Sequence, residues 1–198
     1  MYLGMHSLLD VSAGVLYGLV ILVVVMPLLE PIDYLIMNYE SAPFVLFPLG
    51  LIICYLYPKV KRWSTTRSDT AIVIGTVVGF TIGSALNNYI GLLIKPDAPP
   101  LYDIHYPDTH GMFNVVIRTV FGMTVLLLTR QTIKPIFKKI LCTIFFQDPT
   151  NIENMRKKRI EIPLNYLTYL FLGFNVTFTS PYVFRLLNIE RDYSYTEL

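Results

Sequence analysis

The fold of this chain is decided by residues 8–29, LLDVSAGVLYGLVILVVVMPLL, in which Asp10 is the one charged residue. A helix needs about 20 apolar residues to cross the hydrocarbon core of a bilayer, and this run is long enough. The composition agrees, since 54% of the 198 residues are hydrophobic and only 15% are charged. Because lipid cannot satisfy backbone polar groups, we predict an all-α, polytopic transmembrane helix bundle.

Five apolar stretches are the predicted membrane segments. Four are long enough for full spans, whereas the second is short and contains Pro48, so that it is either a tilted span or a re-entrant segment. Neither a linker nor an internal repeat is evident, and we predict a single membrane domain over residues 1–198, the C-terminal part of a larger domain. The predicted segments are residues 8–29, 44–57, 71–94, 112–129 and 164–187.

The basic residues predict the orientation of the loops. Of the 16 Lys and Arg residues, four lie in residues 58–69 and eight in residues 130–163, whereas residues 32–43 have none. The positive-inside rule therefore places the two basic segments in the cytosol. Five full spans would put the N-terminal end on the cytosolic side as well, and a non-crossing second segment would put it on the lumenal side.

Several functional classes have no support. The net charge is only +2, without a basic face interleaved with aromatic residues, so we predict no nucleic acid partner. The two cysteines suggest neither a disulfide framework nor a metal site. Residues 103–110, DIHYPDTH, offer four potential ligands, but their spacing matches no zinc pattern and Pro107 favours an ordinary turn. We therefore predict neither a metal site nor a cofactor.

Titratable side chains at the start of the first span are the candidate site. His6 and Asp10 are four residues apart, so on a helix they project from one face, where the carboxylate can hold one imidazole nitrogen and leave the other free to react. A second interpretation is structural. Ser7 followed by Asp10 has the form of a capping box, with Asp in place of Glu, at the positive end of a helix. Spacing alone leaves both open.

Small residues form a ridge in the third stretch. Gly75, Gly79, Gly83, Asn87 and Gly91 follow one another at a four-residue step. Such ridges let membrane helices approach closely, and an amide inside the ridge can hydrogen-bond to the neighbouring helix. We predict that this ridge is structural.

Longer motifs carry a resemblance to a known family. Residues 2–10, YLGMHSLLD, followed by Ala13-Gly14, resemble the third signature motif of the type 2 phosphatidic acid phosphatase superfamily, in the version of the sphingosine-1-phosphate phosphatases. Residues 63–71, WSTTRSDTA, residues 162–169, IPLNYLTY, and the Pro181-Tyr182 pair match that subfamily in the same order.

The resemblance implies a metal-independent lipid phosphate phosphatase of the endoplasmic reticulum membrane, with a sphingoid base 1-phosphate as substrate. His6 matches the histidine that attacks phosphorus and becomes a phosphohistidine, and Asp10 matches the aspartate that orients it. In the family, arginines and a lysine neutralise the phosphate, and a second histidine donates a proton to the leaving alcohol.

The chain also departs from the family pattern. The Ser-Arg that opens the third motif and the two earlier motifs have no counterpart in these 198 residues. We therefore expect this polypeptide alone to be inactive or nearly so. The alternative hypothesis is a non-catalytic multi-span membrane protein, such as a transporter, channel or scaffold, in which His6 and Asp10 only cap a helix.

Overall fold

A computed structural model describes residues 7–39, 41–58, 65–92 and 109–189, and within these ranges every regular element is a helix. The all-α prediction is therefore confirmed. Contacts divide the chain into two units, residues 1–42 and residues 43–198. The helices are α1 (Leu8–Asn38), α2 (Ala42–Leu56), α3 (Thr66–Tyr89), α4 (Thr109–Ile144), α5 (Ile152–Met155), α6 (Lys158–Phe174), the π-helix η1 (Asn175–Thr179) and α7 (Ser180–Leu186).

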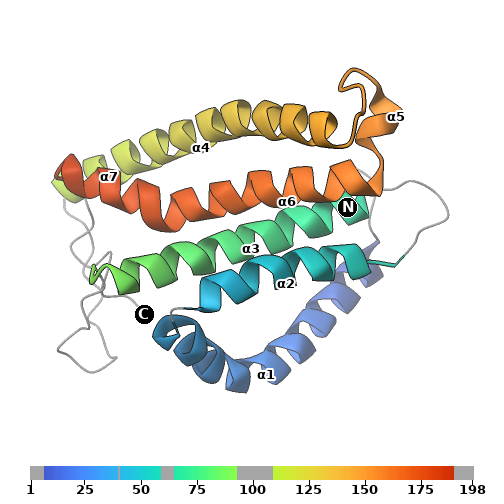
Figure 1. Cartoon of the computed structure of the whole chain (residues 1–198). Helices are drawn as coiled ribbons and strands as arrows, with labels where there is room; N and C mark the ends of the chain where they lie inside the picture. The colour runs from blue at the N-terminus through green and yellow to red at the C-terminus, as the bar shows by residue number, and fades with distance from the viewer. Residues whose placement is uncertain (1–6, 40, 59–64, 93–108, 190–198) are drawn as a thin grey trace. The chain divides into compact units, whose positions relative to one another are not determined.

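Helix α1 makes up most of the first unit. It is 31 residues long and continues past Leu29, so the prediction of a loop over residues 32–43 is wrong for most of its length. Pro27 and Pro31 lie inside the helix, which is bent along its course (Figure 1). Proline removes one backbone hydrogen bond and bends a helix without ending it when the flanking residues stay helical.

The centre of the second unit is the pair α3 and α6. A side-chain Cβ at Gly75 would lie 2.5 Å from the carbonyl oxygen of Tyr166, and one at Gly79 would overlap the carbonyl oxygen of Leu170. On the opposite helix, a Cβ at Gly173 would overlap the carbonyl oxygen of Thr76. The predicted ridge is thus a contact surface at Gly75 and Gly79, and the close approach is possible because α6 has a glycine of its own. Gly91 does not belong to this surface, because it lies beyond the end of α3 and a Cβ there would meet nothing within 4 Å.

Tyr166 joins α2 to this pair. Its side chain is fully buried, and its hydroxyl donates a hydrogen bond of 2.7 Å to the carbonyl oxygen of Phe47 in α2. The Phe47 and Tyr166 rings meet edge to face with centroids 5.8 Å apart. The core around Tyr166 consists of Cys54, Ala71, Val78, Ile162 and Leu170.

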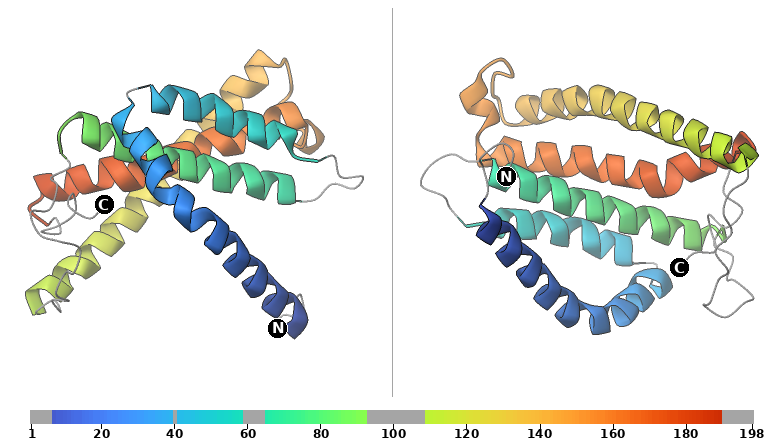
Figure 2. Two further views of the ribbon diagram at one scale, coloured as in Figure 1. Left: turned by 90° about the horizontal axis from the view of Figure 1, so that it is seen from below. Right: turned by 180° about the vertical axis from the view of Figure 1, so that it is seen from behind.

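Helix α4 differs from the prediction in length. The fourth predicted span ended at residue 129, whereas α4 continues to Ile144, is 36 residues long and has Pro135 inside it. It packs on α6 and α7. The rings of Phe137 in α4 and Phe171 in α6 have centroids 5.5 Å apart, and those of Phe121 in α4 and Phe184 in α7 have centroids 6.0 Å apart. It crosses α6 obliquely (Figure 2).

The last predicted span, residues 164–187, corresponds to α6, η1 and α7, which follow one another without a break. None of the three is by itself a long apolar helix, so four full spans are one more than the described residues show. Three helices are long and apolar enough to cross a membrane, at Leu8–Ile36, Thr66–Tyr89 and Gly111–Ile144. Helix α2, with 15 residues, is the short apolar segment that the sequence predicted.

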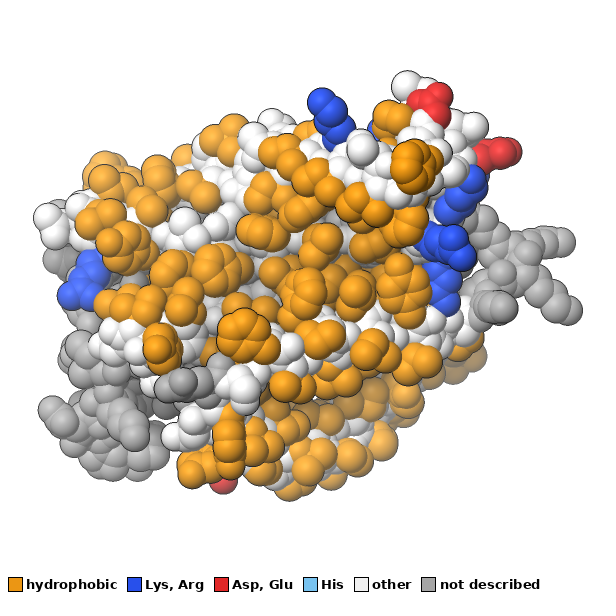
Figure 3. Space-filling model, in the orientation of Figure 1, with side chains coloured by type: hydrophobic (Ala, Val, Ile, Leu, Met, Phe, Trp, Pro, Cys, Tyr) orange, Lys and Arg blue, Asp and Glu red, His pale blue; other side chains and the backbone are white. Residues whose placement is uncertain are grey.

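Many large apolar side chains are exposed on the helices of the second unit. On the face drawn in Figure 3 hydrophobic side chains cover much of the surface, and several Lys and Arg side chains gather at the end where α5 and the start of α6 lie. Exposed residues such as Val73 and Val77 on α3 and Leu127 and Leu128 on α4 would be costly in water and are suited to lipid. The chain is a multi-span membrane protein.

Candidate functional site

Asp10 is held by Ser7 at the start of α1. The backbone N–H of Ser7 donates to the carboxylate Oδ2 of Asp10 at 2.8 Å, and the backbone N–H of Asp10 donates to the Ser7 hydroxyl at 3.2 Å. This is a capping box, so the capping function that the sequence left open for these two residues is present. His6 lies outside the described residues, and its predicted interaction with Asp10 stays a prediction.

The capping box fixes one oxygen of the carboxylate. Since the Ser7 N–H uses Oδ2, the geometry leaves Oδ1 of Asp10 able to accept a second hydrogen bond. The amides of Leu8 and Leu9 come before the first backbone bond of the helix, which runs from Val11 N to Ser7 O. This helix end therefore combines an anchored carboxylate with amides that favour a negatively charged group nearby.

The second family-like segment, residues 63–71, includes the start of α3 at Thr66. Residues 59–64 lie outside the described residues, but Arg67 is placed: its Nε donates to Glu161 Oε2 at 2.8 Å and its Nη2 donates to the Arg156 carbonyl at 2.9 Å. Its second guanidinium contact to Glu161 completes the ion pair. Arg67 thus links α3 to α6, and its positive charge is neutralised by the carboxylate of Glu161.

Neighbouring side chains strengthen the same junction. The amide of Asn165 in α6 donates to the Ser68 hydroxyl at 2.7 Å, and both Glu161 and Asn165 are buried. Helix α3 begins at Thr66, so Asp69 lies in its first turn. Sequence reasoning missed the role of Glu161, although a carboxylate next to an apolar stretch was a signal that a cation lies opposite.

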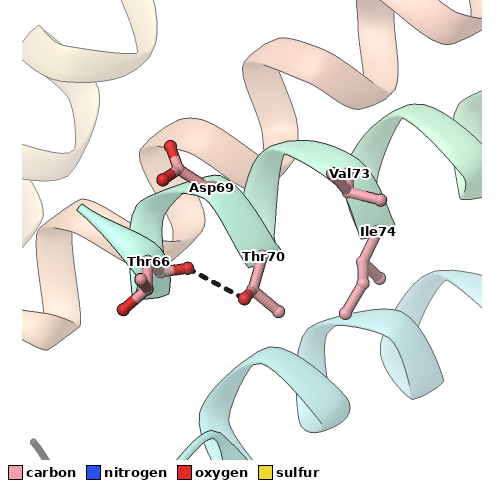
Figure 4. Close-up of a pocket in the computed structure, with 5 residues that line it drawn as sticks. All are labelled: Thr66, Asp69, Thr70, Val73 and Ile74. Atoms are coloured by element: carbon pink, nitrogen blue, oxygen red, sulfur yellow. Dashed lines mark hydrogen bonds between the residues drawn. The ribbon is translucent and has the colours of Figure 1, made fainter. Parts of the chain in front are cut away.

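An open hollow lies beside this segment. It is lined by one face of α3, with Thr66, Asp69 and Thr70 at its polar end and Val73 and Ile74 at its apolar end (Figure 4). The Thr70 hydroxyl donates to the Thr66 carbonyl at 2.8 Å, so it is already partnered. Among the described residues its lining has one carboxylate and two threonine hydroxyls but neither a cation nor a histidine, so these five residues do not form the set that phosphoryl transfer requires.

Two further polar features that the sequence analysis considered are Asn87 and residues 103–110. The Asn87 amide donates to the Thr177 carbonyl at 2.8 Å, which confirms interhelical hydrogen bonding within the ridge. Of the segment considered as a metal site, residues 103–108 lie outside the described residues. Within the described ranges no three His, Cys, Asp or Glu side chains come together as a metal site would require.

Comparison with known proteins confirms the resemblance. The chain is 35% identical over 191 residues to sphingosine-1-phosphate phosphatase 1 of Mus musculus, and 34% identical to the Rattus norvegicus protein of that name. It is 29% identical over 191 residues to sphingosine-1-phosphate phosphatase 2 of Homo sapiens. These alignments cover 96% of this chain.

The relatives are longer than this chain. The 198 residues span 44% of the mouse type 1 protein and 48% of the human type 2 protein. No protein-family model matches the chain, and no solved structure matches it.

Proposed function

We propose, from the similarity to sphingosine-1-phosphate phosphatases along 96% of the chain, that these residues form part of a lipid phosphate phosphatase. The substrate is sphingosine 1-phosphate or a related sphingoid base phosphate. His6 is the nucleophile and Asp10 orients it. The location is the endoplasmic reticulum membrane, where the acyl-like tail of the substrate stays in lipid while its head reaches the end of α1.

The reaction proceeds in two steps. One imidazole nitrogen of His6 attacks phosphorus, the bond from phosphorus to the lipid oxygen breaks, and the leaving oxygen takes a proton from a general acid. Water then attacks the phosphohistidine, the nitrogen–phosphorus bond breaks, and inorganic phosphate leaves. Asp10 accepts a hydrogen bond from the other imidazole nitrogen through Oδ1, which holds the ring in the reactive tautomer. This chemistry calls for neither a metal nor a cofactor.

The 198-residue polypeptide by itself is expected to hydrolyse sphingosine 1-phosphate at a rate close to background. The general acid and most of the phosphate-binding cations of the family pattern have no counterpart in it, and loss of such groups removes several kcal/mol of transition-state stabilisation. The measurement is phosphate release from labelled sphingosine 1-phosphate in detergent micelles. The control is a chimera in which these residues replace the matching segment of the mouse type 1 protein. A rate from the short chain equal to that of the chimera would contradict the expectation.

The second candidate function is non-catalytic, and the capping box between Ser7 and Asp10 favours it. Two substitutions in the chimera separate the candidates. Asp10→Asn keeps an oxygen that can accept the Ser7 N–H but removes the charge that orients and stabilises an imidazolium. Ser7→Ala removes only the capping hydroxyl, which costs about 1 kcal/mol of helix stability.

For a phosphatase we expect Asp10→Asn to lower kcat/KM by roughly a hundredfold or more, and Ser7→Ala to have a much smaller effect. Helix content from far-UV circular dichroism should be the same in both variants. If Asp10→Asn keeps full activity while Ser7→Ala reduces it through unfolding, Asp10 serves only as a cap and its catalytic assignment is wrong.

A further inference from the structure

Three basic side chains follow one another along α4. Arg130, Lys134 and Lys138 are spaced by four residues, and we call them the basic stripe. Arg130 is exposed, whereas Lys134 and Lys138 are half-buried. Their partial burial agrees with the packing of this side of α4. Phe137, three residues after Lys134, contacts the Phe171 ring of α6. Leu141, three residues after Lys138, is buried. The stripe therefore borders the seam between α4 and α6.

The described residues supply no acidic partner for the basic stripe. Within these ranges the ion pair that forms is Arg67 with Glu161, which uses the buried carboxylate of α6. Asp148 accepts hydrogen bonds from the backbone and hydroxyl of Thr150 at 2.8 and 2.7 Å. Like charges four residues apart destabilise a helix, and half-buried cations lose part of their hydration. An anion other than the carboxylates of the described residues would relieve both costs.

The length of α4 indicates where this anion lies. At about 1.5 Å per residue its 36 residues measure about 54 Å, well beyond a hydrocarbon thickness of about 30 Å. The most apolar part is residues 112–129, and the basic stripe begins directly after it. Eight of the 16 Lys and Arg residues lie in residues 130–163, which assigns this end to the cytosol. The cytosolic leaflet carries the anionic lipids, and Lys and Arg side chains extend to reach their headgroups.

We propose that the basic stripe binds the headgroup phosphate of an anionic phospholipid of the cytosolic leaflet at the seam between α4 and α6. The lipid's acyl chains lie along the exposed apolar surface of α4, and its headgroup neutralises Lys134 and Lys138. This site is independent of His6 and Asp10 and stands whether or not the chain takes part in catalysis.

The test uses the purified 198-residue chain reconstituted in phosphatidylcholine vesicles that contain a trace of spin-labelled phosphatidylserine or spin-labelled phosphatidylcholine. Electron paramagnetic resonance measures the motionally restricted fraction of each lipid and hence its association constant relative to the bulk. We expect phosphatidylserine to associate more strongly than phosphatidylcholine with the unmodified chain. In Arg130→Gln/Lys134→Gln/Lys138→Gln this association should weaken by roughly tenfold or more.

Two matched controls make the test specific. Lys138→Gln and Lys139→Gln remove the same charge from adjacent positions, but Lys139 is exposed and lies about 100° around the helix. Only Lys138→Gln should weaken phosphatidylserine association. Arg130→Lys/Lys134→Arg/Lys138→Arg keeps every charge and should retain it. Equal effects of the two single substitutions, loss in the charge-preserving variant, or absence of a phosphatidylserine preference in the unmodified chain would each overturn the proposal.

Discussion

Replacing His6 by alanine in the chimera is expected to lower kcat/KM for sphingosine 1-phosphate by about a thousandfold or more. Removing a covalent nucleophile leaves only binding and electrostatic stabilisation, and a factor of a thousand corresponds to about 4 kcal/mol of activation free energy. The substitution should also abolish the phosphoenzyme. Rapid quenching after mixing with labelled substrate measures that species directly, because phosphohistidine is labile in acid and stable in alkali.

The other two histidines provide the control for this experiment. His105 and His110 do not lie in a phosphatase-like motif, so His105→Ala and His110→Ala should leave both the rate and the trapped phosphoenzyme close to those of the parent. A labelled intermediate that persists in His6→Ala, or that disappears in His110→Ala instead, would show that the nucleophile lies elsewhere. The catalytic assignment of His6 would then be wrong.

Gly79→Ala is expected to destabilise the second unit by roughly 1–3 kcal/mol, and Gly79→Val by more. A Cβ at Gly79 would overlap the Leu170 carbonyl oxygen and lie 2.9 Å from both the Leu170 carbonyl carbon and the Phe174 nitrogen. All three are backbone atoms, which cannot rotate away as a side chain can, so α3 and α6 must separate. The free energy of unfolding is measured by far-UV circular dichroism of the purified chain during titration of mild-detergent micelles with dodecyl sulfate.

Gly18→Ala is the matched control in the same chain. Gly18 also lies in a helix, α1, but a Cβ there meets no described atom within 4 Å, so the added methyl group changes helix propensity without overpacking. We expect its unfolding free energy to equal or exceed that of the parent. If Gly79→Ala is as stable as Gly18→Ala, the close contact of α3 with α6 does not contribute to stability as the structure implies.

Features that depend only on residues close together in the sequence were predicted correctly. The apolar runs of α1, α2 and α3 were recognisable because spanning a bilayer is a requirement of length and composition that each segment meets by itself. The capping box of Ser7 and Asp10 was recognisable for a similar reason, since its atoms belong to residues three positions apart. Helix ends were less predictable. The predicted spans ended at residues 29 and 129, yet α1 and α4 continue beyond these positions and through Pro31 and Pro135, because the flanking residues remain helical.

The sequence by itself determined that this is an all-helical membrane protein with a phosphatase-like motif at the start of its first span, because composition, periodicity and motif spacing are properties of neighbouring residues. Only the tertiary structure decided that Arg67 is paired with Glu161, 94 positions away, and that the glycine ridge packs on Gly173 and its neighbours in α6. Such contacts depend on which helices meet and at what angle. That choice is made by the packing of whole surfaces, which no local pattern contains.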